Sequence, residues 1–209
     1  MELHDALPSR STPRRNPFSL ERMAAILEIP EVRRRVSHLS VEEYHRLDEF
    51  NENGKRTELI RGIVIEKMSK SPLHAAVAQH IYDMLQRLAP AGCVVWQEGP
   101  LTLADSEPEP DVAIVRGTLR DFVARHPATA ELVVEVAVSS VVLDRENASL
   151  YAEAGVTEYW IVLAQEREVE VYRRPVQGRY AEKRLYRADE TIECTGLTGI
   201  RIRVSEIFP

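Results

Sequence analysis

The feature that most constrains the fold is a short, nearly continuous apolar run over residues 132–137, which contains one acidic residue. Its length and its valines are typical of a central strand buried on both faces of a sheet. Glu135 interrupts the run, and an unpaired buried carboxylate costs several kcal/mol. Two interpretations stay open: a basic partner or a water-facing sheet edge satisfies Glu135, or a bound cation does.

The surrounding patterns alternate between helix and strand. Apolar residues at helical spacing predict helices over residues 41–50, 72–88 and 144–154, the first two after the capping residues Ser40 and Ser71. A hairpin or bent strand is expected over residues 58–68 around Gly62, and weaker β-like material over residues 180–209. Further strands are expected over residues 94–96, 101–103, 112–115, 159–163 and 168–172.

Length and composition favour one domain with an extension. We expect residues 1–37 to form a partly disordered N-terminal extension with a short helix over residues 20–28, and residues 38–209 to form the domain. No segment has the length and apolarity of a membrane span. The two cysteines, Cys93 and Cys194, lie far apart without nearby Cys or His, which excludes a disulfide framework and predicts a cytoplasmic protein.

Asp111 is a second acidic residue at a strand, since it follows Pro110 directly before the apolar run 112–115. If the strands of Asp111 and Glu135 are neighbours, the two carboxylates converge. A Pro-Asp pair by itself is common in plain turns. The net charge of -6 gives no general attraction to phosphate backbones, so any nucleic-acid contact requires a local basic patch or a bound cation.

Several segments in order carry a resemblance to a known family. They are residues 56–64 (RTELIRGIV), Met68-Ser69, His74, Pro110-Asp111, residues 132–136 (LVVEV), 150–155 (LYAEAG) and 158–162 (EYWIV). This order resembles the Uma-two family, whose members are regarded as endonucleases of the PD-(D/E)xK restriction-endonuclease-like superfamily. The resemblance covers residues 39–209 and implies an α/β (α+β) fold, with a mixed central sheet flanked by helices and extra β-hairpins.

The same resemblance implies a metal site. Glu58, Asp111 and Glu135 match the acidic positions that bind a divalent ion, with the carbonyl of Val136 as a further ligand and His74 at the rim. Magnesium suits carboxylate oxygens, and manganese is a second choice. For His74, a ring bonded to a nearby backbone group is an equally good interpretation.

The sequence departs from the superfamily at the catalytic lysine. Ala137 stands two residues after Glu135, where a lysine is expected, and the helix that carries a substitute lysine in relatives has none near Asn147. The remaining cations are Lys67, Lys70 and Arg145, of which arginine is a poor general base near neutral pH.

Three functions follow from these residues. The first is a metal-dependent endonuclease that hydrolyses DNA phosphodiester bonds, weakened by the loss of the lysine. The second is a catalytically inactive nuclease fold that serves as a nucleic-acid-binding or interaction module. The third is another metal-dependent hydrolase. A homodimer is expected, because a duplex has two strands to cut and two-fold oligomers are common.

Overall fold

The structure is a computed structural model that describes residues 26–48, 55–138 and 141–209. The chain divides into two units, residues 1–38 and 39–209. In the first unit, residues 26–28 are helical and α2 spans Pro30–Arg33. Residues 1–25 of the extension expected over residues 1–37, with most of the helix expected over residues 20–28, lie outside the described residues. No helix in the described part is long and apolar enough to cross a membrane.

The second unit is built on a six-stranded mixed sheet in the order β3-β4-β5-β6-β7-β8. Only β5 and β6 run parallel, and α5 connects them; the other neighbours are antiparallel. This is the mixed sheet flanked by helices that the sequence predicts. The strands span Cys93–Gln97 (β3), Val112–Arg116 (β4), Leu132–Ala137 (β5), Glu158–Leu163 (β6), Glu168–Val176 (β7) and Arg179–Tyr186 (β8).

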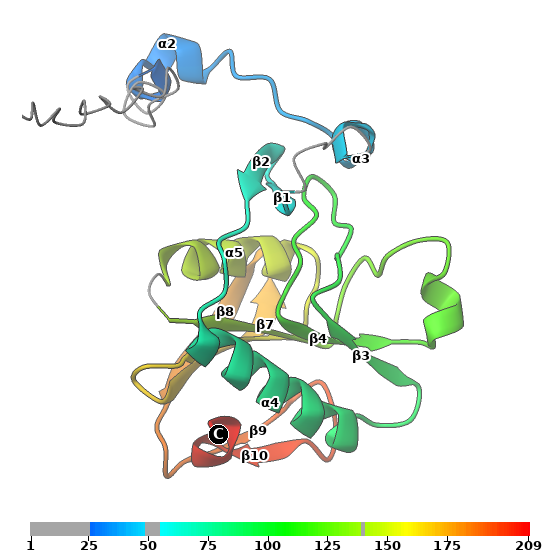
Figure 1. The fold of residues 1–209 in the computed structure, drawn as a ribbon, viewed down its shortest axis with the longest axis vertical. Helices are drawn as coiled ribbons and strands as arrows, with labels where there is room; N and C mark the ends of the chain where they lie inside the picture. The colour runs from blue at the N-terminus through cyan, green and yellow to red at the C-terminus, as the bar shows by residue number, and fades with distance from the viewer. Residues whose placement is uncertain (1–25, 49–54, 139–140) are drawn as a thin grey trace, which may run out of the picture. The chain divides into compact units, whose positions relative to one another are not determined.

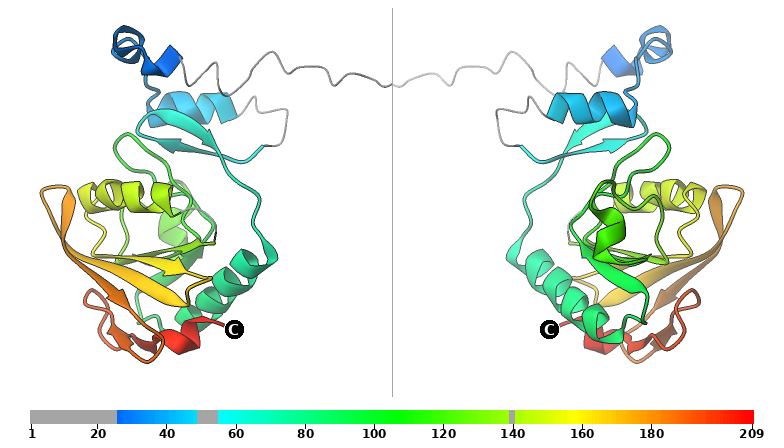
Figure 2. Two further views of the ribbon diagram at one scale, coloured as in Figure 1. Left: turned by 90° about the vertical axis from the view of Figure 1, so that its left-hand side faces the viewer. Right: turned by 90° about the vertical axis from the view of Figure 1, so that its right-hand side faces the viewer.

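Both faces of the sheet are covered (Figures 1 and 2). Helix α4 (Pro72–Leu88) lies on one face together with the small β9–β10 sheet (Thr191–Glu193 and Arg201–Arg203) and the 3-10 turn η2 (Val204–Ile207). Helix α5 (Val142–Glu153) lies on the other. Because side chains alternate along a strand, Val134 packs in the α4 layer and Val133 in the α5 layer. The apolar run of β5 is continuous because both faces are buried.

Local sequence signals explain where the elements begin. Before α3 (Val41–Asp48), the Ser40 N–H donates to Glu43 Oε2 at 2.9 Å and the Glu43 N–H to Ser40 Oγ at 3.2 Å, the predicted capping box. The Ser71 side chain caps α4 by accepting a hydrogen bond from the His74 N–H at 3.2 Å. Strands β1 (Thr57–Ile60) and β2 (Ile63–Glu66) form the expected hairpin, and the positive φ angles of 53° and 75° at Arg61 and Gly62 suit its two-residue turn.

Some predicted elements were wrong. Residues 101–103 are not a strand, because their N–H groups donate to the carbonyls of Pro108, Pro127 and Ser106 in neighbouring loops. The 3-10 turn η1 (Leu119–Phe122) was not expected. Helix α5 begins two residues earlier than predicted, and the end of the helix predicted over residues 41–50 lies outside the described residues.

A fully buried carboxylate ties the C-terminal segment to the sheet. Glu158 is 0% exposed and accepts hydrogen bonds from Trp160 Nε1 at 2.6 Å, Arg173 Nη2 at 3.0 Å and the Thr195 N–H at 2.9 Å. Removing one partner of a buried ion pair leaves the other charge without compensation, which is costly.

We therefore expect Glu158→Ala to lower the free energy of unfolding by about 3–5 kcal/mol. The control is Glu182→Ala, which removes an exposed ion pair with Arg174 and should cost about 1 kcal/mol or less. Urea denaturation of both variants measures the difference. Equal stability of the two variants would contradict a stabilising role for Glu158.

Candidate active site

The pairing of β4 with β5 places two carboxylates together. Val112 lies opposite Val134, so the next register position sets Asp111 against Glu135. The Asp111 N–H donates to Glu135 Oε2 at 3.2 Å, and the Val136 N–H donates to Asp111 Oδ2 at 2.8 Å. Backbone groups of each strand thus hold the carboxylate of the other, as expected for neighbouring strands.

Glu58 reaches the same region from the β1–β2 hairpin. Its Oε1 accepts hydrogen bonds from the Glu109 N–H at 2.7 Å and from Lys67 Nζ at 2.9 Å. Glu109 lies two residues before Asp111, so this contact fixes the hairpin beside the strand entrance. The predicted acidic residues Glu58, Asp111 and Glu135 therefore belong to one cluster, which we call the carboxylate cluster.

Glu135 is the electrostatically strained member of the cluster. Burial raises its pKa well above the usual value, and the negative charges of Asp111, Asp144 and Glu58 raise it further. The hydroxyl of the buried Tyr151 in α5 donates to Glu135 Oε1 at 2.9 Å and orients the carboxyl group. This site favours either a proton on Glu135 or a nearby positive charge.

Asp111 behaves in the opposite way. Burial raises its pKa, but the hydrogen bond and charge of His74, together with Lys70, outweigh burial and lower the pKa overall. His74 Nε2 lies 3.1 Å from Asp111 Oδ2, so the ring contacts the cluster rather than a local backbone group. In the described part of the chain His74 Nδ1 is buried without a hydrogen-bond partner.

Two lysines supply the positive charge beside the cluster. Lys67 Nζ bonds Glu58 and also donates to the Glu109 carbonyl at 2.8 Å. Lys70 Nζ donates to Asp111 Oδ1 at 2.7 Å and lies 2.9 Å from Glu98 Oε1. Both come from the segment that joins β2 to α4 and are only 14% and 22% exposed. The lysines thus approach from a part of the chain remote from Ala137.

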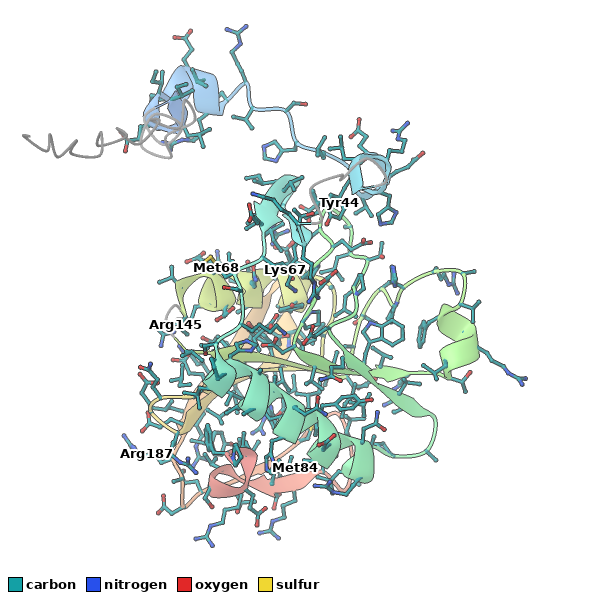
Figure 3. The ribbon with its side chains drawn as sticks, viewed as in Figure 1. Tyr44, Lys67, Met68, Met84, Arg145 and Arg187 are labelled. Carbon is teal, nitrogen blue, oxygen red and sulfur yellow. The ribbon has the colours of Figure 1, made fainter. Side chains whose placement is uncertain are left out.

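Arg145 is engaged elsewhere. Its guanidinium pairs with Glu170 of β7 at 2.6 Å, and Figure 3 shows Arg145 and Lys67 at separate places around α5. Burial raises the pKa of Glu170, but its hydrogen bonds with Arg145, Lys183 and Tyr172 outweigh burial and lower the pKa to about 2. The structure therefore brings His74 and Lys67 to the cluster but not Arg145.

Asp144 is an acidic residue that the sequence did not single out. Burial, with the charges of Asp111 and Glu58, raises its pKa to about 6. Asp144 lies in the first turn of α5, which follows β5 directly. An acidic residue at the start of the helix that follows the Glu135 strand was the sequence signal that could have indicated Asp144 as a site residue.

Oxygen donors dominate the cluster. As the side chains lie, no three Asp, Glu, His or Cys groups among residues 26–48, 55–138 and 141–209 are grouped closely enough to hold one metal ion. Lys67 and Lys70 occupy positions next to Glu58 and Asp111 instead. Binding of a cation therefore requires these side chains to exchange partners.

The raised pKa of Asp144 gives a pH prediction. Because the native state binds this proton more tightly than the unfolded chain, native stability falls as pH rises from about 4 to about 6. Since one pKa unit corresponds to about 1.4 kcal/mol, Asp144→Asn should gain on the order of 2 kcal/mol at about pH 7, and little at about pH 4. Thermal melts at both pH values measure this gain. An Asp144→Asn gain that did not change with pH, or one matched by the exposed Asp189→Asn, would contradict it.

Comparison with known proteins agrees with this architecture. A putative nuclease belonging to DUF820 from Anabaena variabilis ATCC 29413 has a solved crystal structure similar to this chain, with a TM-score of 0.67 and 17% sequence identity. The match covers 81% of this chain and 97% of that one, and at this identity it shows the fold alone. No functionally curated protein matches the chain. The model of the Uma2 family, described as "Putative restriction endonuclease", matches residues 41–205, and the chain therefore belongs to the Uma2 family.

Proposed function

We propose that this protein is a metal-dependent endonuclease that hydrolyses DNA phosphodiester bonds at the carboxylate cluster. The observation that carries the proposal is the placement of Glu135 in a buried central strand directly beside Asp111. Burying two neighbouring carboxylates lowers the stability of the fold, so stability does not explain why the pair is there. Membership of a family described as restriction endonucleases supplies the substrate class.

The residues present fit a divalent cation by their chemistry. Glu58, Asp111 and Glu135 offer hard oxygen donors, and the negative charges around Glu135 create a site that a cation stabilises. These three residues, with the carbonyl of Val136, are the proposed ligands. Magnesium is the first choice and manganese the second, because both accept carboxylate and water ligands. When bound, such an ion polarises a phosphoryl oxygen and lowers the pKa of a water molecule.

The remaining residues of the site have proposed roles of their own. The Tyr151 hydroxyl and the Asp111 N–H orient Glu135, while His74 and the Val136 N–H orient Asp111. Lys67 and Lys70 place positive charge where a scissile phosphate would meet the cluster, which stabilises negative charge that develops during hydrolysis. They compensate for the absence of a lysine at Ala137.

One observation favours an alternative, a catalytically inactive nuclease fold that binds nucleic acid or a protein. Ala137 and Asn147, at the two positions where a catalytic lysine is expected, are uncharged residues with buried side chains. In this alternative Lys67 and Lys70 serve only to neutralise Glu58 and Asp111 within the fold.

Plasmid cleavage tests the proposed function. We expect the wild-type protein to nick supercoiled DNA in magnesium or manganese, and Asp111→Asn and Glu135→Gln to abolish nicking. Either ion should also raise the melting temperature of the wild type but not of Asp111→Asn, since a ligand that binds only the native state stabilises it. If only Ala137→Lys cuts, the native protein is an inactive nuclease fold; absence of both cleavage and an ion-dependent shift contradicts the metal site.

The lysines are tested separately. Lys67→Met and Lys70→Met should each lower the nicking rate by about 100- to 10,000-fold, the range for loss of a positioned acid-base or charge-stabilising group. The control is Lys55→Met, because Lys55 is a 56% exposed lysine that pairs with Glu66 on the same hairpin. Circular dichroism confirms that each variant is folded. Wild-type rates in both site variants would remove the lysines from the proposal.

A further inference from the structure

A separate hollow lies between α3, the loop after β3 and the loop that joins η1 to β5. It measures about 460 Å³, and its walls include His45, Thr102, Phe122, Arg125 and His126. This volume falls within the range of small-molecule sites. None of these residues belongs to the carboxylate cluster, so the hollow is unexplained by the proposed nuclease activity.

Nitrogen-bearing side chains from two separate segments, His45 of α3 and Arg125 and His126 of the loop after η1, line this hollow. Arg125 is exposed, and the described residues provide it with no ion-pair partner. His126 Nδ1 is buried and lacks a hydrogen-bond partner within the described part of the chain. Buried polar atoms are usually satisfied, so the His126 ring is an unexplained polar group in the wall of the hollow, next to the cationic Arg125. A phosphate provides several such atoms to guanidinium and imidazole groups.

A buried carboxylate orients the third nitrogen group. Glu107 is 5% exposed; its Oε1 lies 2.7 Å from His45 Nε2, and its Oε2 accepts a hydrogen bond from Thr102 Oγ1 at 2.6 Å. Both oxygens of Glu107 are thus engaged by residues of the wall. The Nε2 contact fixes the His45 ring, and Nδ1 donates to an anion when the ring is protonated, because both ring nitrogens then carry hydrogen.

The hollow also has an aromatic wall. Phe122 lines it and meets the edge of Trp96, with ring centroids 5.6 Å apart. Trp96 in turn lies 6.5 Å from the His126 ring. Aromatic side chains held in this way provide a surface on which a planar base can stack. An inorganic anion would need no such wall.

We propose that this hollow binds a nucleotide, with its phosphate against Arg125, His45 and His126 and its base against Phe122. Three features of the hollow support this ligand class: the exposed Arg125, the His45 ring held by Glu107, and the aromatic wall of Phe122 and Trp96. The inference does not depend on the nuclease proposal, because the two sites share no residue.

Isothermal titration calorimetry of the full chain with nucleoside 5′-monophosphates tests the proposal. We expect binding that Arg125→Ala weakens about tenfold, the effect of losing one charge-assisted hydrogen bond. Arg120→Ala is the matched control, because Arg120 is an exposed arginine of the adjacent η1 turn outside the hollow, and it should bind as the wild type does. Unaltered affinity in Arg125→Ala, or no binding by the wild type, would overturn the inference.

Two further ligands separate the parts of the nucleotide. The nucleoside alone and inorganic phosphate should each bind more weakly than the nucleotide. Equal affinity for the nucleoside would overturn the proposed phosphate contacts, and equal affinity for inorganic phosphate would overturn the proposed base contact. Tryptophan fluorescence gives an independent readout, since the chain has two tryptophans and Trp160 is 1% exposed in the core, whereas Trp96 packs against Phe122. A change in emission with nucleotide that Phe122→Ala removes supports the site, and no change contradicts it.

Discussion

The antiparallel pairing of β4 with β5 is the interaction on which the candidate site depends. It sets Asp111 against Glu135 and lets one backbone N–H of each strand hold the carboxylate of the other. The same strands are buried between α4 and α5, so the carboxylates stand at the edge of two apolar layers. The sheet therefore provides both the position of the acidic groups and the low polarity that strengthens their interactions.

This arrangement is costly for the protein without a ligand. Burial and mutual repulsion raise the pKa values of Glu135 and Asp144, which means that the fold disfavours their ionised forms relative to the unfolded chain. Proteins commonly accept such a loss of stability at functional sites. Lys67 and Lys70 offset part of it, and they do so from a segment that also begins α4 through Ser71. The segment over residues 67–71 therefore both starts helix α4 and supplies the positive charge beside the carboxylate cluster.

Much of the fold could be read from periodicity and capping residues. The strands over 112–116 and 132–137, the capping box before α3 and the helix after Ser71 are encoded within a few neighbouring residues, which makes them predictable. The strand predicted over residues 101–103 was wrong because the N–H groups of an alternating apolar segment can donate to loop carbonyls as well as to a neighbouring strand. The site could be predicted only in part: Asp111 and Glu135 were singled out from their strand patterns and Glu58 from the family resemblance, whereas Asp144 was not singled out.

The sequence by itself determined the class of fold, the buried strand with its acidic residue and the membership of a nuclease-like family, because these depend on local pattern and residue type. Tertiary structure decided which charges meet. Lys67 directly follows the hairpin that carries Glu58, nine residues away in sequence, but Lys70 reaches Asp111 across 41 residues, and Arg145 pairs with Glu170. Side-chain partners at such separations depend on how strands and helices pack, which no local pattern records.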